Sequence, residues 1–463
     1  MINFIDRKKE LSALEKFGQG KEAELVIVYG KRRVGKTELI KQFIKNKPHL
    51  YFLAQRINEH ENLKLLSEVV GEFYDDEILR RKGFDNWNWF FEYLKKHAEQ
   101  RLIVVIDEFP YLAEANKGIS SIFQAGWDEY LKDTPIFLIL SGSSIAMMEQ
   151  EALSYKAPLY GRRTGQIFLK PFSFSVCREF YPDISFESCL EFYSIAGGNP
   201  SYLKRFDPKI SLDTNIRESI LKPEAFLYNE VEFILREELR EARNYLAILK
   251  AIALSKNKFG EIVNETCIEK GNLHKYLFIL EDLNLIQKEI PVTEKNPLKS
   301  RKGIYKLLDQ FFKFHFRYIL PNKGNIEEDR IDFVLRKIKE DFNVLVAENY
   351  EIIAKEIIKD YEDKFFSIAA AGRWWDKNEE IDIVALNEDK NKVLFGEVKW
   401  SNKQVGIDIY QDLKRKSQLI NWENEEIKKY YCLFSKSGFT EAMKQLAKKE
   451  KVILFQKDKL IAS

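Results

Sequence analysis

The feature that most constrains the fold is a short, glycine-bounded loop between an apolar run and a helical pattern. It follows ELVIVYG, precedes the apolar-periodic stretch ELIKQFIK, and reads Gly30-Lys31-Arg32-Arg33-Val34-Gly35-Lys36-Thr37, a full match to GxxxxGK[ST]. Glycines let backbone N–H groups curl around phosphates, and the helix N-terminus adds the positive end of its dipole. We therefore predict a nucleotide site over Gly30 to Glu38, where Lys36 reaches the β- and γ-phosphates and Thr37 binds Mg²⁺.

Apolar runs of strand length alternate with amphipathic segments through the first third of the chain. They occupy residues 24–30, 49–54, 101–107 and 135–142. Uninterrupted apolar runs joined by helices are typical of parallel strands that are buried on both faces. The predicted fold class is therefore α/β, with a P-loop parallel sheet covered by helices on both faces.

Length and composition limit the remaining possibilities. The 463 residues suggest roughly two to four domains, and 45% hydrophobic with 32% charged residues excludes disorder for most of the chain. Lys plus Arg number 74 against 72 Asp plus Glu, a formal net charge of +2, so any nucleic-acid surface must be a local patch. Without a signal core or a bilayer-length apolar stretch, we expect a cytoplasmic protein with no membrane partner. The four widely spaced cysteines are expected to be small buried residues.

The pattern changes along the chain and predicts four domains. A nucleotide-binding core over 1–175 is followed by helical segments over 176–235, which indicate a compact lid. Three helices and two short strands around a polar turn give the winged-helix pattern over 236–325. The stretch PNKGNIEEDR at 321–330 has the composition of a linker. Strands and helices beyond it predict a second, smaller α/β domain over 326–463.

Residues suited to phosphoryl chemistry follow the later strands of the core. One apolar strand ends in Asp107 and Glu108, where an Asp would hold the metal through its water shell and a Glu would orient or deprotonate water. The next strand ends in Ser-Gly-Ser-Ser at 141–144, which is either a γ-phosphate sensor or an ordinary turn. Arg162 and Arg163 are candidates for an arginine finger, in the same chain or across a subunit interface.

Six segments in this order resemble one family of ATPases. They are FIDRKKELSAL, GKRRVGKT, VVIDEFPYL, LILSGSS, PLYGRRTGQIFLKPF and AGGNPSYL. Together they are similar to the AAA-like ATPases found predominantly in archaea, within the STAND group of signal-transduction NTPases, over about residues 1–320. The resemblance implies that Arg7 and Glu10 lie near the nucleotide base and that Gly197 to Pro200 belong to a lid over the nucleotide. A helix C-cap followed by proline is the alternative for that glycine segment.

The last domain carries a second set of charged residues within apolar strands. Asp382 lies in EIDIVAL and Glu397 and Lys399 in VLFGEVK; we expect adjacent antiparallel strands, with Glu397 and Lys399 on one face. Two carboxylates and a lysine suit Mg²⁺ binding and the orientation of water. The pattern resembles the PD-(D/E)xK restriction-endonuclease superfamily, with Glu348 matching its additional carboxylate and Gln418 a helical site residue. An inactive scaffold is the alternative.

The nucleic-acid surface is the least distinct feature of the sequence. Residues 255–320 hold 12 Lys plus Arg and 8 Asp plus Glu, an excess of +4, and the wing contributes Lys295, Lys299, Arg301 and Lys302. Basic wing residues are placed to meet phosphates. The recognition-helix segment NLHKYLFILEDLNL is mostly apolar, so a winged helix that packs between domains is the alternative. We expect Trp374, Trp375 and Trp400 to belong to the core.

Two functions fit these patterns. The first is an ATP- and Mg²⁺-dependent ATPase coupled to a metal-dependent nuclease-like domain that acts on DNA or RNA, with homo-oligomers as working units. The second is a signalling or scaffold STAND ATPase, in which slow turnover of ATP to ADP is a switch and the C-terminal domain binds a partner without cutting anything. The intact Asp382, Glu397 and Lys399 set favours the first, and the near-neutral charge favours the second.

Overall fold

The computed structural model describes residues 4–239, 242–300, 302–376, 378–422 and 426–462. The chain forms two compact units, each built from several segments. The first consists of Met1–Phe180, Gly198–Arg205 and Glu232–Arg240, and the second of Tyr181–Gly197, Phe206–Val231 and Glu241–Ser463. Wing residue Arg301 lies outside the described residues.

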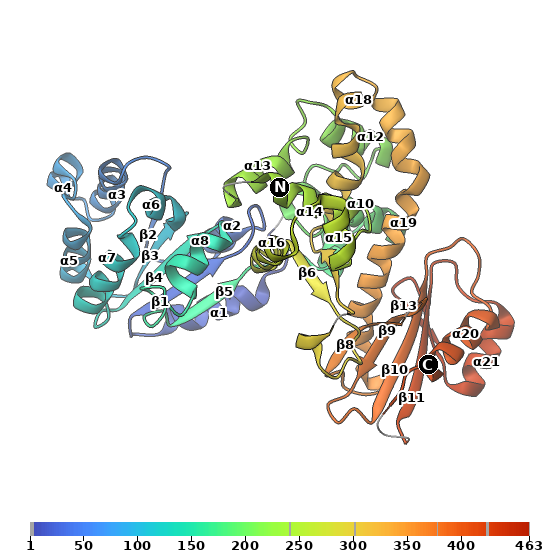
Figure 1. Ribbon diagram of the computed structural model, residues 1–463. Coiled ribbons are helices and arrows are strands. Elements are labelled where there is room, and N and C mark those ends of the chain that lie inside the picture. The colour runs from blue at the N-terminus through green and yellow to red at the C-terminus, as the bar shows by residue number, and fades with distance from the viewer. Residues whose placement is uncertain (1–3, 240–241, 301, 377, 423–425, 463) are drawn as a thin grey trace. The chain divides into compact units, whose positions relative to one another are not determined.

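The first unit is built on a five-stranded parallel sheet (Figure 1). Its strands are arranged in the order β2-β3-β4-β1-β5, with the bounds β1 Glu24–Tyr29, β2 His49–Leu53, β3 Leu102–Asp107, β4 Ile136–Gly142 and β5 Gly165–Phe168. Strands β3 and β4 are buried along their whole length, as expected of central strands covered on both faces. The carboxyl ends of β1, β3 and β4 therefore meet at one edge, where the polar residues predicted to be functional lie.

Two apolar clusters show that helices cover both faces of this sheet. On one face Leu14, Leu39 and Phe43 pack against Val26 and Val28, from helices α1 (Lys8–Gln19) and α2 (Lys36–Ile44). On the other face the cluster is built around aromatic residues such as Phe91 and Phe123. Its helices are α3 Glu59–Phe73, α4 Glu77–Lys82, α5 Trp87–His97, α6 Phe109–Ala115, α7 Ile119–Gly126, η1 Trp127–Leu131, α8 Ile145–Met148 and η2 Glu149–Leu153.

Helices continue beyond β5 and lead into a winged helix. The bounds are α9 Phe174–Phe180, α10 Phe186–Ala196, α11 Pro200–Leu203, α12 Leu212–Ile216, η3 Arg217–Leu221 and α13 Glu230–Glu238. In the winged helix they are α14 Ala242–Ala253, α15 Phe259–Thr266, α16 Lys270–Asp282, β6 Ile286–Glu289, η4 Pro297–Lys299 and β7 Ile304–Leu307. Strands β6 and β7 form an antiparallel pair, as the three-helix and hairpin pattern predicts.

The predicted linker is instead helical. Its residues form η6 (Leu320–Asn322) and α18 (Lys323–Glu327), after α17 (Gln310–Phe314) and η5 (His315–Ile319). Ile326 is buried within this segment, so one apolar side chain ties the polar stretch to the core. The 27-residue helix α19 (Ile331–Ile357) and η7 (Ile358–Lys364) follow.

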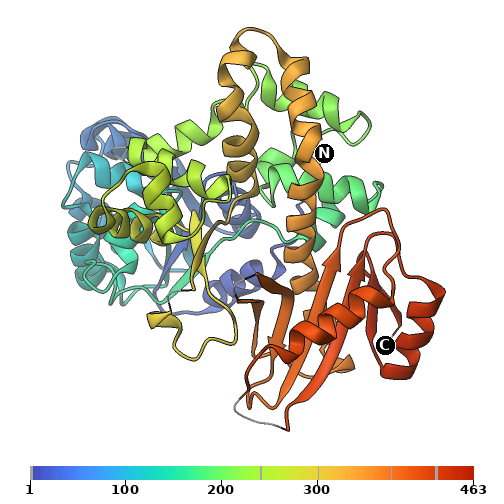
Figure 2. The ribbon, with the colours of Figure 1, turned by 45° about the vertical axis from the view of Figure 1, so that its right-hand side comes forward.

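A six-stranded mixed sheet forms the C-terminal domain (Figure 2). The order is β13-β12-β11-β10-β9-β8, with β9 antiparallel and β11 parallel to β10. The bounds are β8 Ala370–Asp376, β9 Glu379–Leu386, β10 Lys392–Lys399, α20 Ile407–Gln418, β11 Lys428–Ser435, α21 Glu441–Glu450, β12 Ile453–Gln456 and β13 Lys459–Ala462. Helices α20 and α21 lie across one face in Figure 2.

The α/β fold class is confirmed, including the parallel P-loop sheet and the separate C-terminal sheet domain. The division into four domains stays a prediction. All four cysteines are free thiols; three are buried as expected, but Cys267 is exposed. Trp374 and Trp400 are buried, as predicted, whereas Trp375 is half-buried. Across the described ranges, no helix combines the length and apolar character that a bilayer crossing requires.

Candidate functional site

The predicted phosphate-binding loop connects β1 to α2. Gly30 and Gly35 adopt left-handed backbone angles, with φ of 153° and 97°, and a Cβ at Gly30 would collide with the carbonyl oxygen of Leu169. Only glycine fits there without strain. Lys36 Nζ donates hydrogen bonds of 3.0 Å to the carbonyl oxygens of Gly30 and Lys31. Burial lowers the pKa of this ammonium to about 8, so an anion beside it would be stabilised strongly.

A pocket of about 560 Å³ opens beside the loop. Arg32, Arg33, Val34, Gly35, Lys36, Thr37 and Glu38 line its phosphate end, and the rest is lined by Phe4, Ile5, Arg7, Phe172, Phe180 and Lys204 among others. Arg7 lies over the Phe172 ring at 4.6 Å from its centre, and its guanidinium donates to the carbonyl oxygens of Val34, at 3.0 Å, and Lys170, at 2.7 Å. Apolar and aromatic walls beside a phosphate loop suit a nucleotide base.

Asp107 lies at the carboxyl end of β3 and is fully buried. Its Oδ2 accepts hydrogen bonds from Thr37 Oγ1 at 2.8 Å and from the Tyr51 hydroxyl at 2.7 Å. Thr37 and Asp107 thus stand together, as a Mg²⁺ site of a P-loop protein requires. Burial and the Asp107 charge raise the pKa of Tyr51, so the phenol remains a donor that fixes the carboxylate. Tyr51 carries no motif and was missed from the sequence.

Glu108 follows in a left-handed conformation, with φ of 55°. It accepts a hydrogen bond from Ser143 Oγ and a 3.3 Å bond from the Ser143 backbone N–H. Both residues line the pocket. The Ser-rich strand end therefore faces the nucleotide pocket, and Ser143 fixes the carboxylate that is predicted to act on water.

The end of α13 brings two carboxylates into contact with Ser144 and with Arg32 of the phosphate loop. Glu238 accepts a 3.0 Å hydrogen bond from Ser144, and Glu237 lies 2.9 Å from Arg32 Nε. Burial raises the pKa of Glu238 to about 7, although its contacts with Ser144, Arg32 and Lys36 oppose the shift. A carboxylate beside Lys36 is unfavourable once phosphates are present. These residues lie some 200 positions beyond the loop, and no local pattern marks them.

The Gly-Gly-Asn-Pro segment ends a helix and also lines the pocket, whereas its role as a lid over the nucleotide stays a prediction. Gly197 ends α10 with φ of 59°, and its N–H donates to the carbonyl oxygen of Tyr193 at 2.8 Å. Asn199 Nδ2 lies 3.4 Å from the carbonyl oxygen of Arg32, and Pro200 lines the nucleotide pocket. The segment is thus both a helix cap and a wall of the pocket.

Neither candidate arginine finger lies among the residues that line the pocket within this chain. Arg162 is paired with Asp128 at 2.9 Å. Arg163 donates to the carbonyl oxygens of Ala152 and Leu153 and lies over the ring of Tyr160. A finger role within the chain would require these contacts to break, and a role across a subunit interface stays a prediction.

Asp382 and Glu397 lie on β9 and β10, adjacent antiparallel strands as expected. Asp382 Oδ2 accepts a 2.9 Å hydrogen bond from the Val398 backbone N–H, and Lys399 Nζ is 2.7 Å from Glu397 Oε1. Burial raises the pKa of both carboxyls, and the Asp382 charge raises that of Glu397 further. Glu397 Oε2 is buried and has no hydrogen-bond partner among the described residues. Such an orphaned oxygen fits a bound divalent cation.

The expectation for Glu348 was wrong in position. Its carboxylate contacts Lys313 and lies 3.6 Å from Arg317. Glu351, one helical turn further along α19, is the carboxylate whose pKa is raised to about 7, by burial first and then by the Asp382 charge. Residues three apart differ by about 60° around a helix, so Glu348 and Glu351 have different surroundings, and the additional carboxylate of a metal site stays a prediction.

At the Asp382 and Glu397 site, the helix α20 provides Lys416 rather than the predicted Gln418. Lys416 Nζ lies 3.6 Å from Glu397 Oε1 and 3.0 Å from Asp412, whereas Gln418 is exposed. Across the described ranges, no three His, Cys, Asp or Glu side chains are close enough to hold a metal together. A metal here would rely on Asp382 and Glu397, completed by water or backbone oxygen.

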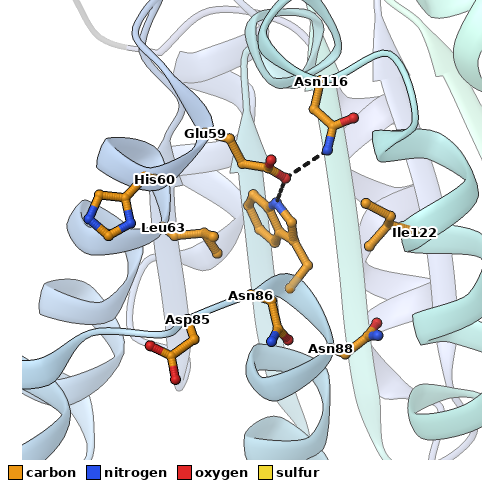
Figure 3. A pocket seen from close by; sticks show the side chains of 9 residues that line it. Glu59, His60, Leu63, Asp85, Asn86, Asn88, Asn116 and Ile122 are labelled. Carbon is orange, nitrogen blue, oxygen red and sulfur yellow. Dashed lines mark hydrogen bonds between the residues drawn. The ribbon is translucent and has the colours of Figure 1, made fainter.

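A smaller pocket of about 300 Å³ lies between α3, α5 and the end of α6 (Figure 3). Trp87 Nε1 and Asn116 Nδ2 both donate to Glu59 Oε1, at 2.9 and 2.8 Å. The two donors satisfy one carboxylate oxygen and join three helices. We assign these contacts a structural role.

Comparisons with known proteins agree with the nucleotide site. A family model described as an ATPase domain predominantly from Archaea matches residues 4–206, and one for archaeal and bacterial proteins of unknown function matches 315–428. An uncharacterized protein of Methanocaldococcus jannaschii is 38% identical over 438 residues, 94% of this chain and 95% of the relative. An uncharacterized ATP-binding protein of the same archaeon is 51% identical over 47 residues, 10% of this chain and 80% of that protein. The Walker-type ATPase of Pyrococcus abyssi is 24% identical, covers 68% of this chain and 96% of its own, and has a TM-score of 0.52, which shows a shared fold.

Proposed function

The chain belongs to the family of P-loop ATPases that are predominantly from Archaea, and on that premise we propose that it couples ATP hydrolysis to a metal-dependent nuclease site in its C-terminal domain. The observation that supports the proposed nuclease site is the buried pair Asp382 and Glu397, with Lys399 beside them. Burying two repelling carboxylates is costly, and positive charge beside them, from Lys399 and from a bound metal, would offset that cost.

At the ATPase site, each residue would have a separate role. The loop N–H groups and Lys36 would bind the phosphates, and Thr37 with Asp107, 2.8 Å apart, would hold Mg²⁺. Bound Mg²⁺ supplies charge neutralisation of the phosphates. Glu108 would orient and deprotonate the attacking water, and Ser143 keeps its carboxylate aimed into the pocket. Arg7 would fix the base end through its contacts with Val34 and Phe172.

At the C-terminal site, Asp382 and Glu397 would hold Mg²⁺. Glu397 would contribute Oε2, the buried oxygen that has no hydrogen-bond partner among the described residues. Burial lowers the pKa of Lys399, but Glu397 outweighs it and the net pKa is raised. The ammonium therefore stays charged and suits stabilisation of negative charge on a phosphodiester. The metal would supply Lewis-acid chemistry there.

The experiment is a cleavage assay on the full chain with labelled DNA and RNA, Mg²⁺ or Mn²⁺, and ATP present or absent. We expect metal-dependent cleavage that ATP alters and that Asp382→Asn and Lys399→Ala abolish. Glu348→Gln is the matched control, because its carboxylate pairs with Lys313 instead of facing Asp382. Equal cleavage by Asp382→Asn and the unchanged chain would refute the nuclease proposal.

A scaffold or signalling ATPase is the second candidate, and one observation favours it. The helix α16, where a winged helix reads DNA, exposes Phe278 at 68% and Ile279 at 38%. Exposed apolar side chains suit a protein partner better than base edges. No cleavage under any condition, with ATP turnover intact, would favour this function.

A further inference from the structure

Tyr51 of edge strand β2 reaches the Asp107 carboxylate from the neighbouring strand. Leu53 is the register partner of Asp107 in the parallel pair of β2 and β3. Side chains two residues apart on a strand project from the same face, so Tyr51 and Asp107 share one face of the sheet. Such diagonal neighbours are within reach of an aromatic side chain, and the Tyr51 hydroxyl donates its 2.7 Å hydrogen bond to Asp107 Oδ2.

Packing holds the ring of Tyr51 in this position. The ring lies against the apolar cluster that α1 and α2 cover, and Lys41 Nζ of α2 lies 5.6 Å from its centre. A cation over the face of a tyrosine ring is attracted to it. The phenol is therefore held by contacts with the sheet and with α2, which do not depend on a bound nucleotide.

Hydrogen bonds from the described residues fill most of the acceptor capacity of the Asp107 carboxylate. Oδ2 accepts two, from the Tyr51 hydroxyl and from Thr37 Oγ1 at 2.8 Å. Oδ1 accepts one, from the backbone N–H of Glu108 at 3.1 Å. An ionised carboxylate has about four lone-pair sites, so about one acceptor site stays open, and it lies on Oδ1. All three donors are neutral, so a cation beside this fully buried carboxylate would be stabilised.

We propose that the Tyr51 hydroxyl makes the Thr37 and Asp107 site selective for Mg²⁺ over Ca²⁺. Tyr51 is a positioning residue: because it occupies Oδ2, the carboxylate cannot bind a metal directly through both oxygens. Ca²⁺ takes about six to eight oxygen ligands and accepts bidentate carboxylates, whereas Mg²⁺ keeps several of its waters and uses few carboxylates. A carboxylate with about one open acceptor site therefore suits the hydrated Mg²⁺ ion. The inference rests on the proposed Mg²⁺ site of the ATPase and names the residue that sets its preference.

The test is calorimetric titration of the full chain with ATP in saturating Mg²⁺ and in saturating Ca²⁺. The measured quantity is the ratio of the ATP affinity in Mg²⁺ to that in Ca²⁺. We expect this ratio to fall about 10-fold in Tyr51→Phe, because the freed Oδ2 can bind Ca²⁺ directly and one hydrogen bond to a charged group is worth about that factor. A purely structural loss would weaken binding in both metals alike.

Tyr93→Phe is the matched control. The Tyr93 hydroxyl also donates to an aspartate, Asp76 Oδ2 at 3.0 Å, but this pair joins α5 to the start of α4 and is not part of the nucleotide site. The control therefore removes the same kind of hydrogen bond without changing Asp107, and its affinity ratio should equal that of the unchanged chain.

The outcomes separate metal selectivity from ATP hydrolysis. An affinity ratio that is unchanged or raised in Tyr51→Phe overturns the inference, even if the unchanged chain hydrolyses ATP. An equal fall in Tyr93→Phe, or no preference for Mg²⁺ in the unchanged chain, overturns it as well. A fall confined to Tyr51→Phe supports it, and if the unchanged chain then releases no phosphate from Mg²⁺-ATP, only the ATPase proposal fails. Thermal melting shows whether each variant is folded, and a partly unfolded sample lowers both affinities without changing their ratio.

Discussion

Replacement of Glu238 by Gln should change how ATP binding depends on pH. Glu238 lies at the end of α13, where Ser144 donates to it and where Arg32, Lys36 and Glu237 are the charged groups that face it. Its pKa is raised to about 7, mainly by burial. In its charged form it repels a γ-phosphate held by Lys36, and in its neutral form it does not.

The magnitude follows from that pKa. With a pKa of about 7, the neutral fraction is about 90% at pH 6 and about 10% at pH 8. If ATP binds only when Glu238 is neutral, its affinity should fall about 10-fold between these pH values. Glu238→Gln is neutral throughout, so it should match the unchanged chain near pH 6 and bind about 10-fold more tightly near pH 8. The ionisation of ATP itself is common to both proteins and cancels in the ratio.

The assay is calorimetric titration with ATP at both pH values, with Glu237→Gln as the matched control. Glu237 is the adjacent carboxylate, is 31% exposed and pairs with Arg32, so its removal should leave the pH ratio unchanged. If the ratio of the ATP affinities at the two pH values is the same for Glu238→Gln and for the unchanged chain, the reasoning is refuted. The raised pKa also makes stability depend on pH. Because the folded chain binds this proton more tightly than the unfolded chain, protonation of Glu238 stabilises the fold below about pH 4.5, and this stabilisation is lost as pH rises through about 7.

Three further predictions concern the same unit. Lys36→Ala should lose ATP binding in titration, because the buried ammonium is the cation next to the phosphate loop; retained ATP turnover would refute the assignment of this site as an ATPase site. Ser143→Ala should lower kcat about 10-fold with little change in KM, because only the orientation of the Glu108 carboxylate is lost. A kcat equal to that of the unchanged chain would show that Ser143 has no part in the mechanism. Gly198→Ala should lower stability by about 2 kcal/mol or more, because its Cβ would collide with the carbonyl oxygen of Phe172. Gly161→Ala, with open space around its Cβ, is the control in thermal melting, and equal melting points would contradict this account.

Much of the fold could be predicted from local patterns. The strand before Gly30 and the strand ending at Asp107 are continuous apolar runs whose ends carry the functional groups, whereas the hairpin of Asp382 and Glu397 carries them inside apolar strands. Such runs report burial directly. The segment 321–330 is helical rather than irregular, because the apolar side chain of Ile326 is buried and anchors an otherwise exposed polar helix. The short strand β13 at the chain's end was missed because its residues alternate weakly between exposed and half-buried.

The candidate sites could be predicted only where a residue belongs to a contiguous motif. Lys36, Thr37 and Asp107 are such residues. Glu238 and Tyr51 reach the nucleotide site from distant segments, so their roles depend on tertiary packing. Glu348, which was predicted as the additional carboxylate, contacts Lys313 and Arg317, because helical register, rather than spacing from a motif, decides what each side chain of a helix meets.

The measurement that tests the central claim most directly is phosphate release from Mg²⁺-ATP by the unchanged chain and by Glu108→Gln, with ATP binding measured in parallel. The account predicts Mg²⁺-dependent turnover by the unchanged chain and a loss of about 100-fold or more in Glu108→Gln with ATP affinity retained. Turnover by Glu108→Gln at the unchanged rate would contradict the assignment of Glu108, and no turnover by the unchanged chain would contradict the account of this site as an ATPase.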